Sequence, residues 1–300
     1  MIPRIARAIA CAALVVVSAA PPALAQLSAN LGALTAENTK GYLKPLSSAL
    51  SGTLNSAVFQ SGRVPKTGVN FTVGVRLMGV SFADDDRLYT PKDPPGFTGI
   101  ASVQAPTIVG DTRAVLQPGQ SGTGLYHPGG FAIDNFAIAV PQLEIGSVFG
   151  TRAVVRWISL NVGDADFGKI ELFGIGAQHS ISQHLPPGFP VDLAAGAFYQ
   201  TFSIGDDLVK AKSLHLNVTG SKRYGVLEPY VGVGYDNLKL DVSYTSTISV
   251  PEQKIAVDFD PEGNAHLTAG IQANLAFVKL HGELNLAAQN GAAVGVRFGK

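Results

Sequence analysis

The chain has 300 residues, of which 22 are lysine or arginine and 22 are aspartate or glutamate, so its formal net charge is zero. Without an excess of basic residues, the composition excludes nucleic acid as an expected partner. The length suits one domain, and the 34 glycines suit tight turns and crowded strand faces.

The N-terminus has the pattern of a secretory signal peptide. Arg4 and Arg7 precede an apolar stretch over residues 9–20, and residues 23–25 form a small-x-small cleavage site. Cleavage after Ala25 would remove the single cysteine, Cys11, and with it any disulfide. Residues 1–25 are therefore the predicted signal peptide. No later stretch reaches the roughly eighteen apolar residues that a membrane helix needs, so any crossing has to be made by strands.

Residues 26–66 form an N-terminal helical segment. Between Thr35 and Gln60, apolar residues recur at spacings of three and four, which is typical of an amphipathic helix with Pro45 in its first turn. This stripe consists of Leu43, Leu46, Leu50, Leu54 and Val58. The opposite face is polar but carries no charge after Lys44, which suits a mildly polar cavity. The helix is a candidate plug of a barrel lumen, and a helix against the periplasmic rim is the alternative.

The first strand pattern follows at residues 69–77, with apolar residues at the odd positions. The even positions are polar and include Arg76. Alternation then disappears from residue 83 to residue 130, where paired prolines, paired glycines and three consecutive aspartates indicate a long outer loop. Within this loop we expect a short hairpin around residues 100–109.

Alternation returns after the loop, in less regular form. The predicted strands are residues 131–147, 151–162, 168–179, 191–203 and 208–221. Two long strands then flank a turn near Pro251. On the first of them the apolar residues are at odd positions up to Tyr235 and at even positions from Leu238 onward. This change of parity predicts a β-bulge at Asp236 and Asn237.

The last thirty-five residues carry the strongest pattern. Residues 265–275, 278–288 and 294–298 alternate apolar and polar side chains with a period of two, and Phe298 is the last apolar residue. In an exported chain, such hairpins joined end to end favour a membrane barrel. A secreted β-sandwich, which can alternate in the same way, is the alternative.

These segments amount to about ten strands, with eight or twelve as alternatives. The predicted fold is all-β: an antiparallel transmembrane β-barrel over residues 67–300, preceded by the N-terminal amphipathic helix. An even number of strands returns both termini to the periplasmic side. In this topology six aromatic residues lie near the inner ends of strands, where a girdle belongs. They are Phe71, Phe149, Tyr224, Tyr230, Phe277 and Phe298.

The connection between the last two strands predicts their register. A three-residue loop at positions 289–291, with Gly291 in the left-handed conformation, keeps both apolar faces on the same side. Counting along the ladder then places Glu283 directly opposite Arg297 on the inward face. We therefore predict an ion pair between these two side chains.

The histidines do not form a predicted metal site. His266 and His281 face inward on neighbouring strands but lie several rungs apart, which we interpret as polarity of the lumen wall. His179 and His184 flank a connection with two consecutive prolines, and we interpret both as turn residues. Acidic clusters, such as residues 84–86, have the composition of solvated loops and lack the spacing of a calcium loop.

The sequence has no motif that anchors an enzyme. It lacks the Gly-x-Ser-x-Gly elbow, and residues 232–234 lack the third glycine of a dinucleotide fingerprint. We expect neither a cofactor nor catalysis. The alternative is a serine and histidine pair on the outer wall, as in an outer-membrane lipase, because such pairs are defined by geometry and not by spacing.

Three segments carry a resemblance: Gly41-Tyr42-Leu43, residues 228–235 and residues 267–286. Through them the chain, from about Gly41 to Phe298, resembles an uncharacterised family of bacterial outer-membrane β-barrel proteins. Its architecture is also similar to that of long-chain fatty acid transporters, which are barrels plugged by an N-terminal segment. Their Asn-Pro-Ala string is absent here, so no fatty-acid ligand is carried over. Because the chain ends in Gly299-Lys300, an assembly signal would have to use Phe298.

The expected protein is exported to the outer membrane of a Gram-negative bacterium, with outer-membrane lipid and the barrel-assembly machinery as partners. Its lumen would be narrow, partly filled by the helix, and would pass or bind a small solute. The mixed signs of the lumen wall argue against strong ion selectivity. A non-conducting barrel with a structural or surface-interaction role, using loop 83–130, is the alternative. The predicted lumen-lining residues are Arg76, Gln272, Asn274, Lys279, His281, Glu283, Asn285 and Arg297.

Overall fold

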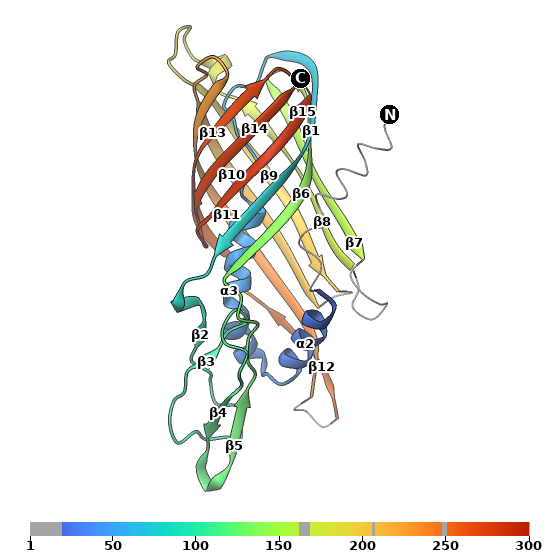
Figure 1. Cartoon of the computed structure of the whole chain (residues 1–300), viewed down its shortest axis with the longest axis vertical. Coiled ribbons are helices and arrows are strands. Elements are labelled where there is room, and N and C mark those ends of the chain that lie inside the picture. Colours follow the sequence, from blue (N-terminus) through green and yellow to red (C-terminus); the bar gives the residue numbers. More distant parts are fainter. Residues whose placement is uncertain (1–19, 162–168, 206–207, 248–250, 300) are drawn as a thin grey trace.

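A computed structural model describes residues 20–161, 169–205, 208–247 and 251–299, without the side chains of residues 20–25, 69 and 262. Its α-helices are α2 (Ala20–Gly32) and α3 (Ala36–Leu54) (Figure 1), and short 3-10 helices cover residues 84–86, 120–122 and 182–184. The long strands are β1 (Thr67–Ser81), β6 (Asn135–Val148), β7 (Thr151–Asn161), β8 (Lys169–Ser180), β9 (Asp192–Ile204), β10 (Val209–Ser221), β11 (Leu227–Ser246), β13 (Glu262–Leu275), β14 (Val278–Leu286) and β15 (Gly291–Gly299). The short strands are β2 (Leu88–Tyr89), β3 (Ala105–Pro106), β4 (Val115–Pro118), β5 (Gly124–His127) and β12 (Gln253–Asp258).

The ten long strands close into one antiparallel barrel. They follow the order β10-β9-β8-β7-β6-β1-β15-β14-β13-β11, and β12 pairs with the far part of β11. A ladder between β10 and β11 joins the two ends of this order, so the described barrel strands have no free edge. The predicted all-β barrel of about ten strands is confirmed, and its closure rules out the β-sandwich.

The two ends of the barrel differ in their connections. At the inner end, where β1 begins and β15 ends, strands are joined by turns as short as residues 149–150 and 276–277. The opposite, outer end carries the long connection 82–134 and the extension formed by β11 and β12 (Figure 1). In outer-membrane barrels the short turns face the periplasm and the long loops face the medium, which corresponds to the inner and outer ends of this barrel.

The long connection contains two small hairpin-like pairs. Strands β4 and β5 form a hairpin, and β2 pairs with β3. The hairpin expected at residues 100–109 is therefore wrong, because Ala105 and Pro106 pair with Tyr89 and Leu88 instead of with a neighbouring turn of the same segment. Pro106 also lacks the N–H that a longer ladder would need.

Strand β11 extends beyond the lipid-facing part of the barrel. Its register with β10 and β13 is continuous through Asp236, so the predicted bulge is wrong. Odd-numbered side chains point outward along the whole strand, first Val231 and Val233, and farther out Lys239. The apolar positions change parity because the outward face meets lipid up to Tyr235 and water beyond it, whereas the far inward face packs against α2 and α3.

Two belts of exposed aromatic side chains bound the lipid-facing surface. The inner belt contains five of the six predicted residues, namely Phe71, Phe149, Tyr224, Phe277 and Phe298. The sixth prediction, Tyr230, is wrong: this even-numbered residue points into the lumen and is 2% exposed. The outer belt contains Trp157, Phe173, Tyr199 and Tyr235. On β11 the lipid-facing part is residues 227–235, close to the roughly nine to eleven residues of a transmembrane strand.

An arginine at position 231 should destabilise the barrel. Val231 is 61% exposed and lies midway along the lipid-facing part of β11, where a charged side chain costs about 2–4 kcal/mol. We expect Val231→Arg to lower the free energy of unfolding from phospholipid vesicles by that amount. The matched change Ser243→Arg, on the same outward face beyond the outer belt, should alter it by less than about 0.5 kcal/mol. Equal losses would contradict the membrane boundary.

Helix α3 enters the barrel from the outer end. The side chain of Thr35 caps it by accepting the Asn38 N–H at 3.3 Å. The Tyr42 hydroxyl donates to the Gly129 carbonyl at 3.0 Å and so ties the helix to the long connection. Burial raises the pKa of Tyr42 to about 12, which keeps this donor protonated. The helix begins at Ala36, so the placement of Pro45 in the first turn is wrong, and Pro45 lies in the helix interior. The helix ends at Leu54, so Val58, predicted on its stripe, lies in the segment that follows.

Helix α2 lies at the outer end as well. It runs across the predicted cleavage site after Ala25, and the carbonyl of its last residue, Gly32, accepts the Thr247 N–H at 2.8 Å. The start of β1 and the end of β15 lie at the same end of the barrel, as an even number of strands predicts, whereas both helices lie at the opposite end. Neither described helix combines the length and apolarity that crossing a bilayer requires.

The apolar core lies between the helices and the outer halves of the strands. Leu31, Leu34, Leu43, Leu50 and Leu54 pack there against Met78, Val140, Leu172, Leu238, Leu240 and Val242, with Leu46 partly buried beside them. This core closes the outer end of the barrel. Toward the inner end, the lumen wall becomes polar, and the candidate site lies in this polar part.

Candidate functional site

A continuous stretch of the N-terminal segment fills the lumen. Every residue from 51 to 62 is buried, although only the first four belong to α3. We call residues 51–62 the plug. At its inner end Gly62 passes so close to the wall that a Cβ would lie 2.2 Å from the Asp192 carbonyl oxygen, and only glycine fits there.

The C-terminus of α3 is held by a buried guanidinium. Arg156, on β7, donates from Nη1 to the Leu54 carbonyl and from Nη2 to the Ser56 carbonyl, both at 2.9 Å, and from Nε to Gln142 Oε1 at 2.7 Å. Gln200 adds a donor to the Leu54 carbonyl at 2.6 Å. The C-terminus of a helix has carbonyls without a hydrogen-bond donor and a partial negative charge. A guanidinium there donates to the carbonyls and is attracted by the charge.

Glu283 holds the next part of the plug. Its Oε1 accepts the Ala57 N–H and its Oε2 accepts the Tyr230 hydroxyl, each at 2.7 Å. The predicted ion pair with Arg297 is wrong, because Glu283 lies opposite Ala293 and Arg297 lies opposite Lys279.

The register differs by four residues because β14 already ends at Leu286, so that the loop comprises residues 287–290. Gly291 is the first residue of β15 and is not in the left-handed conformation predicted for it. Gln289 is drawn into the outer-end connection, where it donates to the Ser81 carbonyl at 2.7 Å and to Asp86 Oδ2 at 3.0 Å. An even shift keeps every side chain on its predicted face.

Nearer the inner end, one carboxylate is shared by three arginines. Glu144 accepts from Arg297 at 2.6 Å, from Arg76 at 3.0 Å and from Arg152 at 3.5 Å. Arg152 also donates to the carbonyl of Ser61 in the plug at 3.2 Å. The cluster thus joins β1, β6, β7 and β15 to the plug, and one negative charge faces three positive charges.

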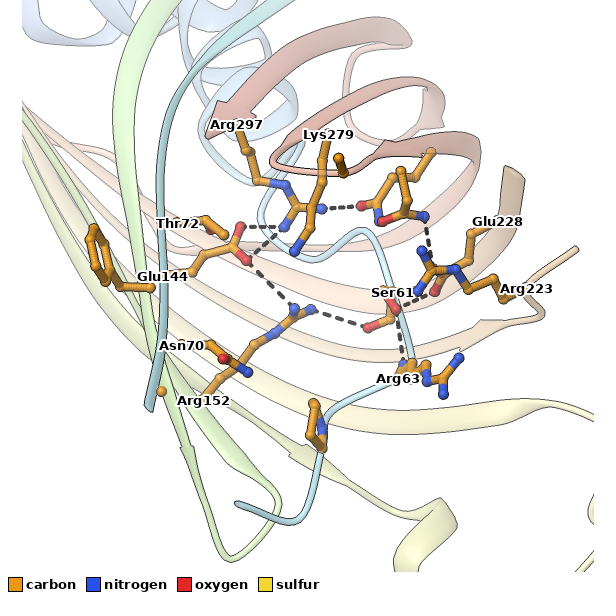
Figure 2. Close-up of a pocket in the computed structure, with 16 residues that line it drawn as sticks. Ser61, Arg63, Asn70, Thr72, Glu144, Arg152, Arg223, Glu228, Lys279 and Arg297 are labelled. Atoms are coloured by element: carbon orange, nitrogen blue, oxygen red, sulfur yellow. Dashed lines mark hydrogen bonds and ion pairs between the residues drawn. The ribbon is translucent and has the colours of Figure 1, made fainter. Parts of the chain in front are cut away.

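A cavity of about 390 Å³ opens below the plug at the inner end (Figure 2). We call it the inner vestibule. Its charged lining consists of Arg63, Arg152, Arg223, Lys279, Arg297, Glu144 and Glu228. The neutral lining includes Thr72, Gln272 and Asn274. Glu228 accepts hydrogen bonds from Ser61 and, at 2.9 Å, from Ser221. The vestibule therefore contains more positive than negative groups.

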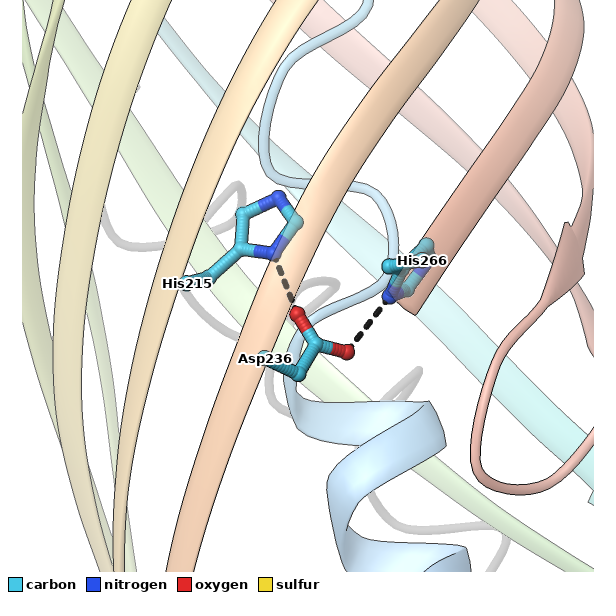
Figure 3. Close-up of side chains that lie close together, drawn as sticks. All are labelled: His215, Asp236 and His266. Carbon is cyan, nitrogen blue, oxygen red and sulfur yellow. Dashed lines mark hydrogen bonds and ion pairs between the residues drawn. The ribbon is translucent and has the colours of Figure 1, made fainter. Parts of the chain in front are cut away.

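A second polar cluster lies higher in the wall. Asp236, on β11, accepts from His215 Nδ1 and His266 Nδ1, each at 2.6 Å (Figure 3). His266 Nε2 contacts Asn285 Oδ1 at 2.9 Å, and Asn285 donates to Glu283 at 3.1 Å. Both ring nitrogens of His266 therefore lie against side-chain oxygens. The cluster links three strands to the carboxylate that holds the plug.

These three residues are also the one group of histidine and acidic ligand atoms that converges among the described residues; the ligand atoms lie within 4.8 Å of one another. Both carboxylate oxygens are already used by the two imidazoles. Sequence reasoning missed this cluster because the assumed bulge at Asp236 obscured its inward position. Continuous parity along β11 would have placed Asp236 inward, next to His215 in the ladder.

The eight predicted lumen-lining residues all lie on the inward face. Gln272, Asn274, Lys279 and Arg297 line the inner vestibule, and Arg76 lies beside them on Glu144. Glu283 and Asn285 lie at the plug, and His281 lies opposite Gln272 and Gly295. Val58 packs in a small separate cluster with Phe59, Val154 and Phe198.

Sequence reasoning missed the functional residues on the less regular strands. Glu144, Arg152 and Arg156 each stand at even positions within mostly apolar segments. On β6 and β7 the even positions face the lumen, as the burial of Gln142, Glu144 and Arg156 shows. The sequence signal for these residues was therefore a charged side chain at an even, lumen-facing position of an otherwise apolar strand.

Comparison with known proteins identifies a family and finds solved structures to which the chain is similar. A family model described as a family of unknown function, DUF6588, matches residues 4–300. No curated protein matches the chain. Among solved structures it is similar to the outer membrane protease OmpT of Escherichia coli, with a TM-score of 0.39 and 9% identity over 80% of this chain and 100% of that chain.

It is also similar to the outer membrane protein OmpT of Vibrio cholerae in its trimer form, with a TM-score of 0.30 and 10% identity over 79% of this chain and 100% of that chain. The toluene transporter TbuX of Ralstonia pickettii has a TM-score of 0.29 and 10% identity over 80% of this chain and 90% of that chain. These likenesses assign no activity to the chain.

Proposed function

This chain belongs to the DUF6588 family of unknown function, and we propose that it is a narrow outer-membrane channel closed by its own plug. A small solute passes, or is bound, when the plug shifts. The observation that carries this proposal is the chemistry of the contact between plug and wall. Arg156, Gln200 and Glu283 hold the plug through hydrogen bonds to its backbone.

A purely structural barrel has no need of such a contact. Replacing buried polar networks by apolar side chains of the same volume is often neutral or stabilising, and the outer end of this same barrel is filled in that way. A polar contact allows the plug to move, because the polar groups of both wall and plug can be hydrated by water once they separate.

The proposal includes the location and the route of the protein. Residues 1–25 direct export and are removed, the barrel-assembly machinery inserts the strands, and Phe298 serves as the terminal aromatic residue. The role is not enzymatic. The exposed apolar face between two aromatic belts supports a membrane location, since a water-soluble protein rarely exposes so large an apolar surface.

The test is conductance in planar bilayers. The full mature chain should show only rare openings, whereas a variant that lacks residues 26–60 should conduct in long-lived discrete steps. The deletion has to include α2, because α2 is fixed at the outer end and Ser61 lies at the inner end. Heat-modifiable electrophoretic mobility must first show that both barrels are folded.

The matched control is removal of residues 115–127, the β4 and β5 hairpin, which projects from the outer end and does not enter the lumen (Figure 1). This variant should stay closed. If the variant without residues 26–60 folds and inserts but passes no current, the channel proposal fails and the non-conducting structural barrel takes its place.

A further inference from the structure

Two positive side chains face each other across the wall of the inner vestibule. Lys279, on β14, lies directly opposite Arg297, on β15, and both point inward (Figure 2). Like charges in directly opposed positions destabilise a sheet. An anion between them would replace repulsion by attraction to both. Glu283, which sequence reasoning assigned to Arg297, is bound to the plug instead.

The acidic groups of the vestibule do not balance its positive charge. Glu144 is already shared by three arginines, and Glu228 accepts from neutral serine and asparagine donors. Within the described part of the chain, Arg63, Arg223 and Lys279 form no ion pair with a carboxylate. The whole lumen wall has mixed signs, as predicted, but its mouth is positive.

Two buried polar groups in the vestibule wall also lack a hydrogen-bond partner within the residues that the structure describes. Arg297 Nε and the Thr72 hydroxyl have no hydrogen-bond partner among the described residues, although the two residues are only 2% and 5% exposed. Both residues line the vestibule. Buried donors are almost always paired in folded proteins, so two orphan groups at the edge of one cavity indicate a ligand that accepts hydrogen bonds.

We propose that the inner vestibule binds a small soluble oxyanion with two or more negative charges, of carboxylate or phosphate chemistry. Its volume of about 390 Å³ is within the range of small-molecule sites. Guanidinium groups match the planar or tetrahedral oxygens of such anions, and Lys279 supplies a point charge. The inference rests on the proposed function in one respect, namely that the bound anion is the solute of the channel. Binding itself does not require the channel to open.

Isothermal titration of the folded, full mature chain in detergent tests the site. Inorganic pyrophosphate and citrate are the two probes, at about 50 mM NaCl, and we expect at least one to bind. Binding of pyrophosphate alone identifies phosphate chemistry, and binding of citrate alone identifies carboxylate chemistry. Lys279→Gln should weaken the affinity about tenfold, the loss expected for one charge-assisted hydrogen bond.

The matched control is Lys212→Gln, which removes the same charge from the outward face of β10 and should change the affinity less than twofold. Arg223→Gln, in an exposed turn outside the barrel ladders, should weaken binding several-fold without any risk to folding. No heat with either probe, or equal losses from Lys212→Gln and Lys279→Gln, would overturn the site. Neither result would touch the conductance of the variant without residues 26–60, so site and channel fail separately.

Discussion

Methionine at position 156 should loosen the plug while the barrel stays folded. The substitution keeps most of the side-chain volume but removes three hydrogen bonds, two of them to the Leu54 and Ser56 carbonyls. A hydrogen bond from a charged donor contributes about 1.5–3 kcal/mol, and the two bonds to the plug together contribute about 3–5 kcal/mol because Gln200 still donates to the Leu54 carbonyl. At 1.4 kcal/mol per factor of ten, the population with the plug released should rise on the order of 10²- to 10³-fold.

Hydrogen exchange measures this release directly, because exchange of a buried amide reports the free energy of local opening. Arg156→Met should accelerate exchange of the amides in residues 51–62, and the strands of the barrel should keep their protection. Arg113→Met is the matched control: Arg113 pairs with Asp111 at 3.0 Å on the exposed outer connection, and an exposed pair of this kind contributes little to stability. If the plug amides stay protected from hydrogen exchange in Arg156→Met, Arg156 does not hold the plug in place.

The barrel itself could be predicted because lipid and lumen impose alternation on every strand. Val231, Val233 and Tyr235 face lipid, and their even-numbered neighbours face the interior. Alternation alone does not show where lipid ends. Beyond Asp236 the same strand keeps its direction but has water outside and the N-terminal helices inside. In the sequence, this change of surroundings moves the apolar residues from odd to even positions, just as a bulge would.

The partners within the site were less predictable. Alternation fixes the face of a side chain but not its register, since a shift of four residues leaves Glu283 and Arg297 inward and still separates them. The main acceptors of Arg156 are backbone carbonyls about a hundred residues earlier in the chain. A carbonyl has no signature in the sequence, so only the threading of the plug through the lumen shows what the buried arginine holds.

This threading also predicts on which side of the membrane the mature chain begins. Helix α2 is tied to the outer end: Gly32 accepts from Thr247, and Asn30 donates to the Gly129 carbonyl at 2.9 Å. A cysteine at the exposed position Ser28 should therefore react with a membrane-impermeant maleimide on intact cells. Labelling should be nearly complete, because in the proposed orientation the exposed surface of α2 faces the medium.

Two matched variants define the sides of the membrane in the same experiment. Gln120→Cys, on the long outer connection, should react on intact cells, and Pro187→Cys, in an exposed inner turn, only after the outer membrane is permeabilised. The wild-type chain gives the background, because its Cys11 lies in the predicted signal peptide. If Ser28→Cys behaves like Pro187→Cys, the N-terminal segment does not run through the lumen from the outer end. If Pro187→Cys reacts and Gln120→Cys does not, the barrel has the opposite orientation.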